Sequence, residues 1–245
     1  MKTIGLIGGV SPESTLIYYR QINRGVQGRL GKAHSARMIL YSMEFQEFAE
    51  LQHAGNWAAL SKIVVQAART VEAAGADFLV ICSNSVHKQA EDVVHNVSIP
   101  LLHIADPTGA AIRQAGLKKA GLLGTKFTMQ ERFLTGRLED SFGLEILVPN
   151  QHDQDLVHCV IYDELTKGIV CPESRQLYRE VIERLGDAGA EGIILGCTEI
   201  MLLIGKEDTS LPVFDTTTLH AEAAVIASLE PRTAAAVSTL SSGNH

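Results

Sequence analysis

The sequence predicts an α/β architecture made of two similar, mostly parallel sheets, each flanked by helices. Short apolar runs, many rich in Val, Ile and Leu, alternate with longer amphipathic stretches, which is the pattern of strand, helix and strand in a parallel sheet. The same strand and turn motifs recur about 114 residues apart. The 245 residues therefore divide into two related units rather than one large domain.

Eight apolar runs are expected to form strands, because each is short and apolar over its length. They are Thr3–Gly8, Arg37–Ser42, Asp77–Cys82, Leu101–Ile104, Ala120–Gly124, Leu144–Val148, Gly192–Gly196 and Val213–Asp215. Helices are expected over residues 60–74, where apolar side chains recur on one face, and over 130–138 and 173–185. Ser11 followed by Pro12 predicts the cap and first residue of an earlier helix. The segment 231–245, rich in Ala, Ser and Thr, predicts a frayed, flexible tail.

Three pairs of matching segments, in the same order in both halves, define the repeat. Ala74–Ile81 matches Ala188–Leu195 at an offset of 114, Gly5–Gly9 matches Gly121–Thr125 at 116, and Ser98–Leu102 matches Ser210–Phe214 at 112. Each match is weak by itself, because glycine-rich strand and turn fragments are common in α/β proteins. Three matches at nearly one offset indicate two units of about 114 residues.

The repeat also aligns two strand ends, which are the places where parallel sheets bind ligands. At the offset of 114, Ser83 matches Cys197 and Cys82 matches Gly196. Because side chains alternate along a strand, we expect Ser83 to face Cys197 across a crevice and Cys82 to point into packing. Two opposed groups suit removal of a proton from one face of a carbon and its return to the other. A thiol suits this work because helix N-termini and nearby donors lower its pKa.

Composition and motifs exclude several classes of function. Asp and Glu outnumber Lys and Arg by 28 to 21 and no basic cluster occurs, so neither nucleic acid nor an anionic membrane is an expected partner. The longest apolar runs are far too short to span a membrane or to form a secretion signal. We therefore expect a cytoplasmic protein with reduced cysteines. No Cys and His spacing suggests a metal site, and the chain has no GxGxxG, GxxxxGK[ST] or GxSxG motif.

Several polar residues near the aligned strand ends have ordinary alternatives. Asn84, Ser85 and Thr198 could simply cap the helices that follow, a use that is compatible with carboxylate binding. Glu13 and Glu199 could be acid–base carboxylates, although first-turn glutamates more often interact with the helix dipole.

Two further readings have weaker support. Lys167 could attract a carboxylate, but most single lysines are solvated. Asp106 and His103 could be imagined with Ser83 as a triad. No orienting pattern in the sequence supports that arrangement.

These residues resemble the aspartate/glutamate racemase family of cofactor-independent amino-acid racemases, and most closely its broad-specificity bacterial branch. The matching stretches are Gly8–Thr15, Asn84–His87, Leu123–Met129 and Gly196–Glu199, with weaker matches at Gln52–Trp57, His103–Asp106 and Phe214–Thr216. The resemblance implies two pseudo-symmetric Rossmann-like domains, an active site in the interdomain crevice, no cofactor or metal, and a homodimer. We expect an N-terminal domain of residues 1–98 plus 216–230, a C-terminal domain of residues 99–215, and then the tail.

The resemblance also implies roles for particular residues. One catalytic thiol of the family falls on Cys197, and the position of the other is occupied by Ser83. The implied substrate contacts are Val10, Ser11, Gln52, Asn84, Ser85, Thr198 and Glu199. Asn84, Ser85 and Thr198 would hold the α-carboxylate and amino group, and Gln52 could reach the end of the substrate's side chain. No arginine stands at residues 45–47, which leaves a broader or neutral amino-acid substrate open.

Ser83 departs from the family pattern in a way that matters for the chemistry. A hydroxyl is a poor base without a partner to accept its proton, so we expect an efficient face at Cys197 and a slow face at Ser83. Racemisation would then favour one enantiomer as substrate, with the equilibrium unchanged. The alternatives are a decarboxylase or cis–trans isomerase of the same superfamily that uses Cys197 alone, or a non-catalytic amino-acid-binding protein.

Overall fold

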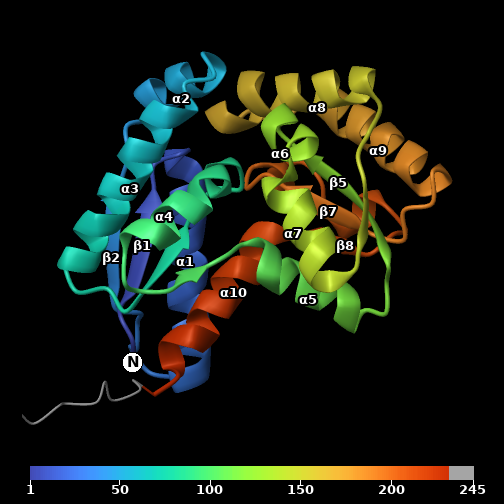
Figure 1. The fold of residues 1–245 in the computed structure, drawn as a ribbon. Coiled ribbons are helices and arrows are strands. Elements are labelled where there is room, and N and C mark those ends of the chain that lie inside the picture. Colours follow the sequence, from blue (N-terminus) through green and yellow to red (C-terminus); the bar gives the residue numbers. More distant parts are fainter. Residues whose placement is uncertain (232–245) are drawn as a thin grey trace, which may run out of the picture.

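The computed structural model describes residues 1–231 and contains two four-stranded parallel sheets (Figure 1). The first has the order β2 (Met38–Ser42), β1 (Ile4–Gly8), β3 (Phe78–Ile81) and β4 (Leu101–Leu102). The second has the order β6 (Glu145–Leu147), β5 (Lys119–Gly124), β7 (Ile193–Gly196) and β8 (Val213–Asp215). Of the expected tail, residues 232–245 lie outside the described residues.

The two sheets confirm the internal repeat. Each strand of the second sheet occupies the place of the strand four positions earlier in the chain, and all pairings within both sheets are parallel. The strands expected from apolar runs all form, although β4 is only two residues long. Burial of β1, β3 and β7 along their whole length explains why their sequences are continuously apolar.

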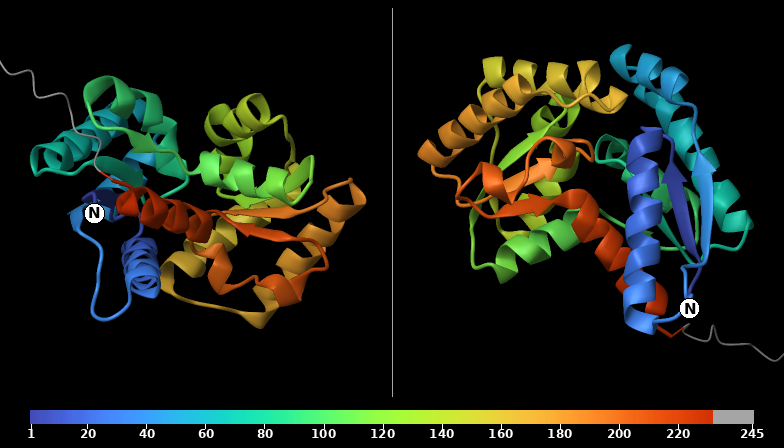
Figure 2. Two further views of the ribbon diagram at one scale, coloured as in Figure 1. Left: turned by 90° about the horizontal axis from the view of Figure 1, so that it is seen from below. Right: turned by 180° about the vertical axis from the view of Figure 1, so that it is seen from behind.

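Helices cover both faces of each sheet (Figures 1 and 2). Around the first sheet lie α1 (Pro12–Leu30), α2 (Phe45–His53), α3 (Trp57–Ala73), the 3-10 turn η1 (Ser85–Gln89), α4 (Ala90–Asn96) and α10 (Thr216–Leu229). Around the second lie α5 (Ala105–Gln114), α6 (Lys126–Gln130), α7 (Arg132–Phe142), α8 (Gln151–Asp163) and α9 (Pro172–Asp187), with 3-10 turns η2 (Leu165–Lys167), η3 (Ile200–Leu202) and η4 (Lys206–Asp208). The chain returns after β8 to pack α10 along α1 (Figure 2). None of the helices in the described part of the chain is long and apolar enough to cross a membrane.

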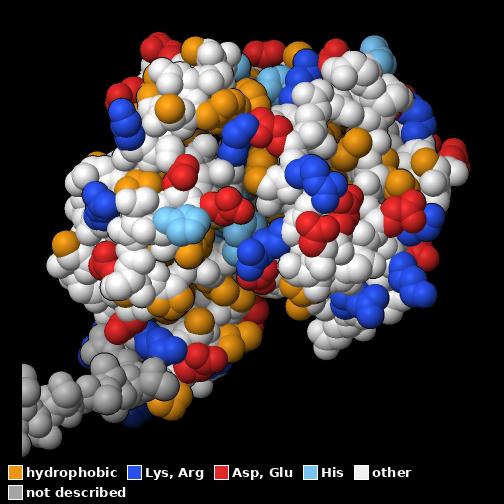
Figure 3. Space-filling model, in the orientation of Figure 1, with side chains coloured by type: hydrophobic (Ala, Val, Ile, Leu, Met, Phe, Trp, Pro, Cys, Tyr) orange, Lys and Arg blue, Asp and Glu red, His pale blue; other side chains and the backbone are white. Residues whose placement is uncertain are grey.

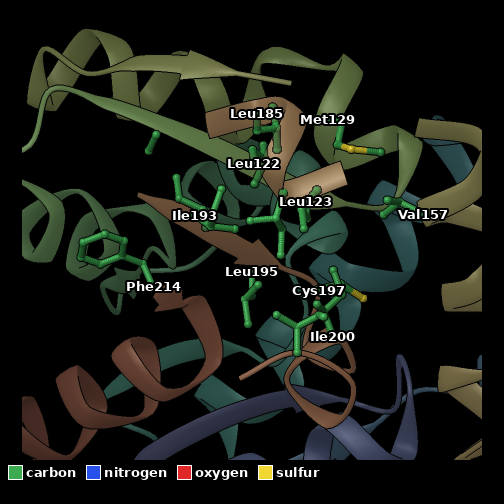
Figure 4. Close-up of a cluster of buried hydrophobic side chains, with 14 of the residues drawn as sticks. Leu122, Leu123, Met129, Val157, Leu185, Ile193, Leu195, Cys197, Ile200 and Phe214 are labelled. Atoms are coloured by element: carbon green, nitrogen blue, oxygen red, sulfur yellow. The ribbon is translucent and has the colours of Figure 1, made fainter. Parts of the chain in front are cut away.

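Three apolar cores hold these layers together. One fills the second domain and includes Leu122, Ile193 and Leu195, with Cys197 at its edge (Figure 4). The other two lie on opposite faces of the first sheet. Cys82 belongs to the core shared with α1 and α10, where it is fully buried. The Cys82 side chain therefore packs inside this core and does not project from the end of β3.

Two expected boundaries differ from the structure. The helix expected over 130–138 is two helices that meet at Glu131, whose backbone is extended (φ −101°, ψ 150°). Thr125 caps the first of them by accepting a hydrogen bond from the Thr128 N–H, so that helix begins before the expected start. The expected domain boundary after residue 98 falls before β4, which pairs with β3 in the first sheet. The crossing between sheets therefore follows Leu102.

The first strand and helix are joined as the Ser–Pro pair predicts. Ser11 is the N-cap of α1 and accepts a hydrogen bond from the Ser14 N–H, and Pro12 is the first helical residue. Gly9, just before it, has φ of +93°, and a Cβ there would lie 2.2 Å from the Met43 carbonyl oxygen. Only glycine fits this close approach of two backbone segments.

Candidate active site

One cavity lies between the two sheets, at the carboxyl ends of β1, β3, β5 and β7. It encloses about 410 Å³ of space, including the opening to solvent. All nine residues to which the sequence assigned catalytic or substrate-binding roles line it. They are Val10, Ser11, Gln52, Ser83, Asn84, Ser85, Cys197, Thr198 and Glu199. The fold therefore brings together residues separated by nearly 190 positions in the chain.

The two candidate proton-transfer groups sit at equivalent strand ends. Ser83 follows β3 by two residues and Cys197 follows β7 by one, and each is 8% exposed. Both line the cavity, whereas Cys82 does not. Cys82 packs into a core and Ser83 lines the cavity, as the alternation of side chains along a strand predicts.

Glu199 is the centre of a buried hydrogen-bond network at the Cys197 side. Its Oε1 accepts from Ser11 Oγ at 2.7 Å, and its Oε2 accepts from Cys197 Sγ at 3.0 Å and Thr198 Oγ1 at 2.6 Å. Ser11 comes from the first domain and Cys197 from the second, so this carboxylate, only 3% exposed, joins them. Glu199 is thus a partner of the thiol rather than of a helix dipole.

These surroundings raise the pKa of the Cys197 thiol, whereas the sequence predicted a lowered pKa. Burial, followed by the charge of Glu199 and its hydrogen bond, raises the pKa of Cys197 well above its usual range. The backbone N–H groups of Glu199 and Thr198 act against this but are weaker causes. The donors that the sequence suggested are present, yet burial and the carboxylate outweigh them. Cys197 is therefore a protonated thiol in this arrangement.

Ser83 has no comparable partner. Its hydroxyl lies 3.4 Å from Ser85 Oγ, and another hydroxyl is a poor acceptor for its proton. His87 is close by in sequence, but its Nδ1 is 2.7 Å from the Ser83 carbonyl oxygen rather than the hydroxyl. Because His87 Nε2 accepts from the Ile104 N–H, Nδ1 carries the hydrogen and donates it. His87 holds the loop in place and is not a base for Ser83.

Asn84 lines the cavity and is held by a hydrogen bond to the first residue of α10. Its Nδ2 donates to Thr216 Oγ1 at 3.0 Å, and that hydroxyl donates its own hydrogen to the Leu195 carbonyl at 2.8 Å. This chain fixes the orientation of the amide, because Thr216 can only accept from Asn84. Asn84 Oδ1 is buried and has no hydrogen-bond partner among the residues that the structure describes. The capping alternative does not describe this residue, since its side chain makes no cap hydrogen bond.

The far wall of the cavity is built across the two domains by α2 and α8. Tyr162 on α8 donates to Gln52 Oε1 on α2 at 3.0 Å. Gln52 Nε2 is buried, with no partner in the described part of the chain. Beside this pair, the ring of His53 meets those of Tyr162 and Phe127 at 5.0 and 6.1 Å. The ring centroids of Trp57 and Phe127 are 5.6 Å apart. These ring contacts join α2 and α3 of the first domain to α6 and α8 of the second.

Sequence reasoning missed seven lining residues. They are Phe45, Thr125, Thr128, Ile161, Tyr162, Thr166 and Gly196. Thr125 follows β5 just as Gly9 follows β1, so the repeat contained a signal for it. Thr166 lies 114 residues after Gln52 and could have been found by extending the repeat into the helices. Ile161 and Tyr162 carry no such signal, because only the packing of α8 turns them toward the cavity.

The weaker sequence candidates lie elsewhere. Lys167 is exposed and pairs with Asp163 at 3.9 Å, and Glu13 is exposed in the first turn of α1. Asp106 forms a bidentate pair with Arg137 at 2.6 and 2.8 Å. No Asp106–His103–Ser83 triad is therefore assembled.

Acidic and basic side chains are intermingled on the face that shows the seam between the domains (Figure 3). Among residues 1–231, no group of three or more His, Cys, Asp and Glu side chains is placed to hold a metal ion. The chemistry available in the cavity is that of a thiol, hydroxyls, amides and one carboxylate.

Comparison with known proteins places this architecture in a family. The family model for Asp/Glu/Hydantoin racemase matches residues 7–224. The chain belongs to this family. Membership confirms the resemblance drawn from the strand-end motifs and supports an isomerase of the amino-acid racemase kind. A homodimer and a cytoplasmic location stay predictions.

Individual relatives agree with this placement. The broad specificity amino-acid racemase RacX of Bacillus subtilis (strain 168) is 26% identical, with 91% of this chain and 96% of that protein aligned. A crystal structure assigned to the Asp/Glu racemases from Yersinia pestis is 47% identical, with a TM-score of 0.88 over 94% of this chain and all of that one. An aspartate racemase homologue from Pyrococcus horikoshii OT3 is 35% identical, with a TM-score of 0.81 and the same coverage.

Proposed function

We propose that this protein racemises amino acids without a cofactor, by moving the Cα proton between Cys197 and Ser83. The observation that supports this most is that these two side chains, which the repeat equates, line one cavity between the two sheets. A substrate held between them presents one face of Cα to each domain. Racemisation requires a proton to leave by one face and to return by the other.

The Cys197–Glu199 pair supplies both protonation states that the reaction needs. As a thiol bonded to Glu199, Cys197 is ready to deliver a proton to its face of Cα. To remove one, it first passes its own proton to Glu199 Oε2, which is already in contact with it. Asn84 Oδ1, buried and unpartnered, is the acceptor for the substrate ammonium. Ser85 and Thr198 offer hydroxyls near the same end.

Ser83 makes the two faces unequal. Proton transfer at the Ser83 face is slow in both directions, because the hydroxyl has no side-chain base to exchange its proton with and must exchange it with water. The equilibrium constant of a racemisation is one, so kcat/KM must be the same for both enantiomers. The inequality therefore appears in the separate kcat and KM values. It also appears as exchange of the α-proton of one enantiomer without inversion.

The test is to incubate L- and D-amino acids with the enzyme in D₂O and to follow deuterium at Cα and the configuration of the product. We expect one enantiomer to exchange faster than it inverts. Cys197→Ala should abolish both exchange and inversion, and Ser83→Cys should raise inversion relative to exchange. Cys159→Ala is the matched control, because Cys159 is exposed and does not line the cavity. Racemisation that survives Cys197→Ala would refute the mechanism.

A second candidate is favoured by the surroundings of Ser83. A decarboxylase or cis–trans isomerase that uses Cys197 alone needs no base at that position. The same D₂O screen separates the two, because such an enzyme would exchange no α-proton of any amino acid. Measurable amino-acid binding without any exchange would instead indicate a binding protein.

A further inference from the structure

The charge of the cavity bears on which amino acids it accepts. Of its 16 lining residues, all within the described part of the chain, Glu199 is the only one with a carboxyl side chain, and no Lys, Arg or His is among them. Glu199 is also deeply buried. The α-ammonium and α-carboxylate of a bound amino acid cancel one another, so the filled cavity keeps this single negative charge.

A second carboxylate on the substrate would therefore be unfavourable. It would leave water, enter a site that already holds a buried carboxylate, and find no lining cation to pair with it. Burial of an unpaired charge and repulsion between like charges both oppose this. The family name points to acidic amino acids, but the lining of this cavity provides nothing that would neutralise their side chains.

The wall formed by α2 and α8 indicates what the side chain should carry instead. Gln52 is 2% exposed, its Oε1 accepts from the Tyr162 hydroxyl, and its Nε2 has no hydrogen-bond partner within residues 1–231. A buried N–H donor without an acceptor is costly. Phe45 and Ile161 line the same cavity and offer apolar contact to methylene groups. A side chain with a short apolar stem and an uncharged oxygen at its end satisfies all of these surroundings.

We propose that the cavity selects amino acids whose side chains end in an uncharged hydrogen-bond acceptor, such as the amides asparagine and glutamine, and discriminates against aspartate and glutamate. Gln52 is the residue that determines this specificity. The inference rests on the proposed function, because it takes the cavity to be the site where an amino acid is deprotonated.

The experiment compares α-proton exchange in D₂O for the two isosteric pairs, asparagine with aspartate and glutamine with glutamate, with alanine as a substrate that cannot reach Gln52. We expect kcat/KM for exchange to be at least tenfold higher for the amide in each pair. Gln52→Leu should lower the ratio of asparagine to alanine exchange. Gln52→Arg, which adds the missing cation, should shift preference within each pair toward the acid. Gln46→Leu is the matched control, since Gln46 is on the same helix but exposed.

The outcomes separate this inference from the function on which it rests. Equal or faster exchange of aspartate and glutamate would overturn the inference and leave racemisation intact. Exchange of alanine but of neither amide would overturn it as well. If no amino acid exchanges, the proposed function itself fails. An unchanged substrate order in Gln52→Leu and Gln52→Arg would remove Gln52 from the specificity argument.

Discussion

Thr216 is the residue whose replacement most sharply tests how the fold positions the candidate site. It lies outside the cavity, at the start of α10, and is fully buried. Its hydroxyl accepts from Asn84 Nδ2 at 3.0 Å and donates to the Leu195 carbonyl at 2.8 Å. It therefore connects the loop after β3 to the strand that carries Cys197. Thr216→Val keeps the shape of the side chain and removes both bonds.

The loss of these two hydrogen bonds sets how much Thr216→Val should lower the free energy of unfolding. Asn84 Nδ2 and the Leu195 carbonyl would both be buried without a partner, and each such group costs about 1–3 kcal/mol. The added methyl group returns about 0.8 kcal/mol at most. We expect the free energy of unfolding to fall by about 1–5 kcal/mol, which denaturant titration resolves. Release of Asn84 should also raise KM for amino-acid exchange about tenfold or more, with a smaller effect on kcat.

Two variants make the test specific. Thr216→Ser retains the hydroxyl and should restore KM even if some packing is lost. Thr218→Val is the same substitution two residues later, on an exposed side chain whose hydrogen bonds with Asp215 and Gln21 are also exposed. It should change the unfolding free energy by less than about 1 kcal/mol, because water can replace these partners. If Thr216→Val behaves like Thr218→Val in both stability and KM, the proposed positioning of Asn84 by Thr216 is wrong.

Three further predictions concern the first turn, the buried histidines and Glu199. Gly9→Ala should lower the unfolding free energy by about 2 kcal/mol or more, because its Cβ would lie 2.2 Å from the Met43 oxygen at a positive φ. In the control, Gly28→Ala should raise the unfolding free energy by up to about 1 kcal/mol, because a Cβ at this exposed position meets no other atom. Burial lowers the pKa of His103 and His220 to about 4, so between pH 6.5 and 4 the unfolded chain takes up protons that the native chain does not. The unfolding free energy should therefore decrease as the pH is lowered through this window, by roughly 3 kcal/mol per histidine. The urea midpoint should decrease with it. His103→Asn should make this pH dependence less steep, whereas His152→Ala, at an exposed position, should leave it unchanged. Glu199→Gln should lower the pKa of Cys197, which would be measured as faster alkylation of the Cys197 peptide at fixed pH, with Cys159 as internal reference. The same substitution should slow α-proton exchange by about 10²–10⁴-fold. Faster exchange would show that Glu199 only suppresses the reactivity of the thiol.

The strands and the strand-end residues were predictable from sequence because their signals are local or repeated. A parallel strand buried on both faces must be apolar throughout, and the repeat then equates Ser83 with Cys197 without any knowledge of distance. β4 was also predicted, as the run Leu101–Ile104 and as the repeat partner of β8. The domain boundary expected after residue 98 nevertheless separated it from β3, with which it pairs.

The walls of the cavity depend on packing that no local pattern encodes. Tyr162 reaches Gln52 across 110 residues only because α8 lies against α2. Its sequence position reads as an ordinary helical aromatic residue. The acidity of Cys197 was also beyond sequence reasoning. Glu199 follows the thiol by two residues, and only the fold shows that its carboxylate turns back to accept from Cys197 and from Ser11 of the other domain.

The reversal of the expected thiol acidity changes how the proposed reaction must begin. A thiol whose pKa is raised by burial and by Glu199 is a proton donor, and Ser83 has no acceptor that would make it a base. The cavity therefore contains two groups in their donor forms and one carboxylate, Glu199, that can accept. Under the proposed function, a turnover that removes the proton at the Cys197 face starts with transfer of the Cys197 proton to Glu199. Because Glu199 also holds Ser11 of the first domain, protonating it weakens a contact between the domains. The reactive thiolate and a looser interdomain contact then arise in the same step.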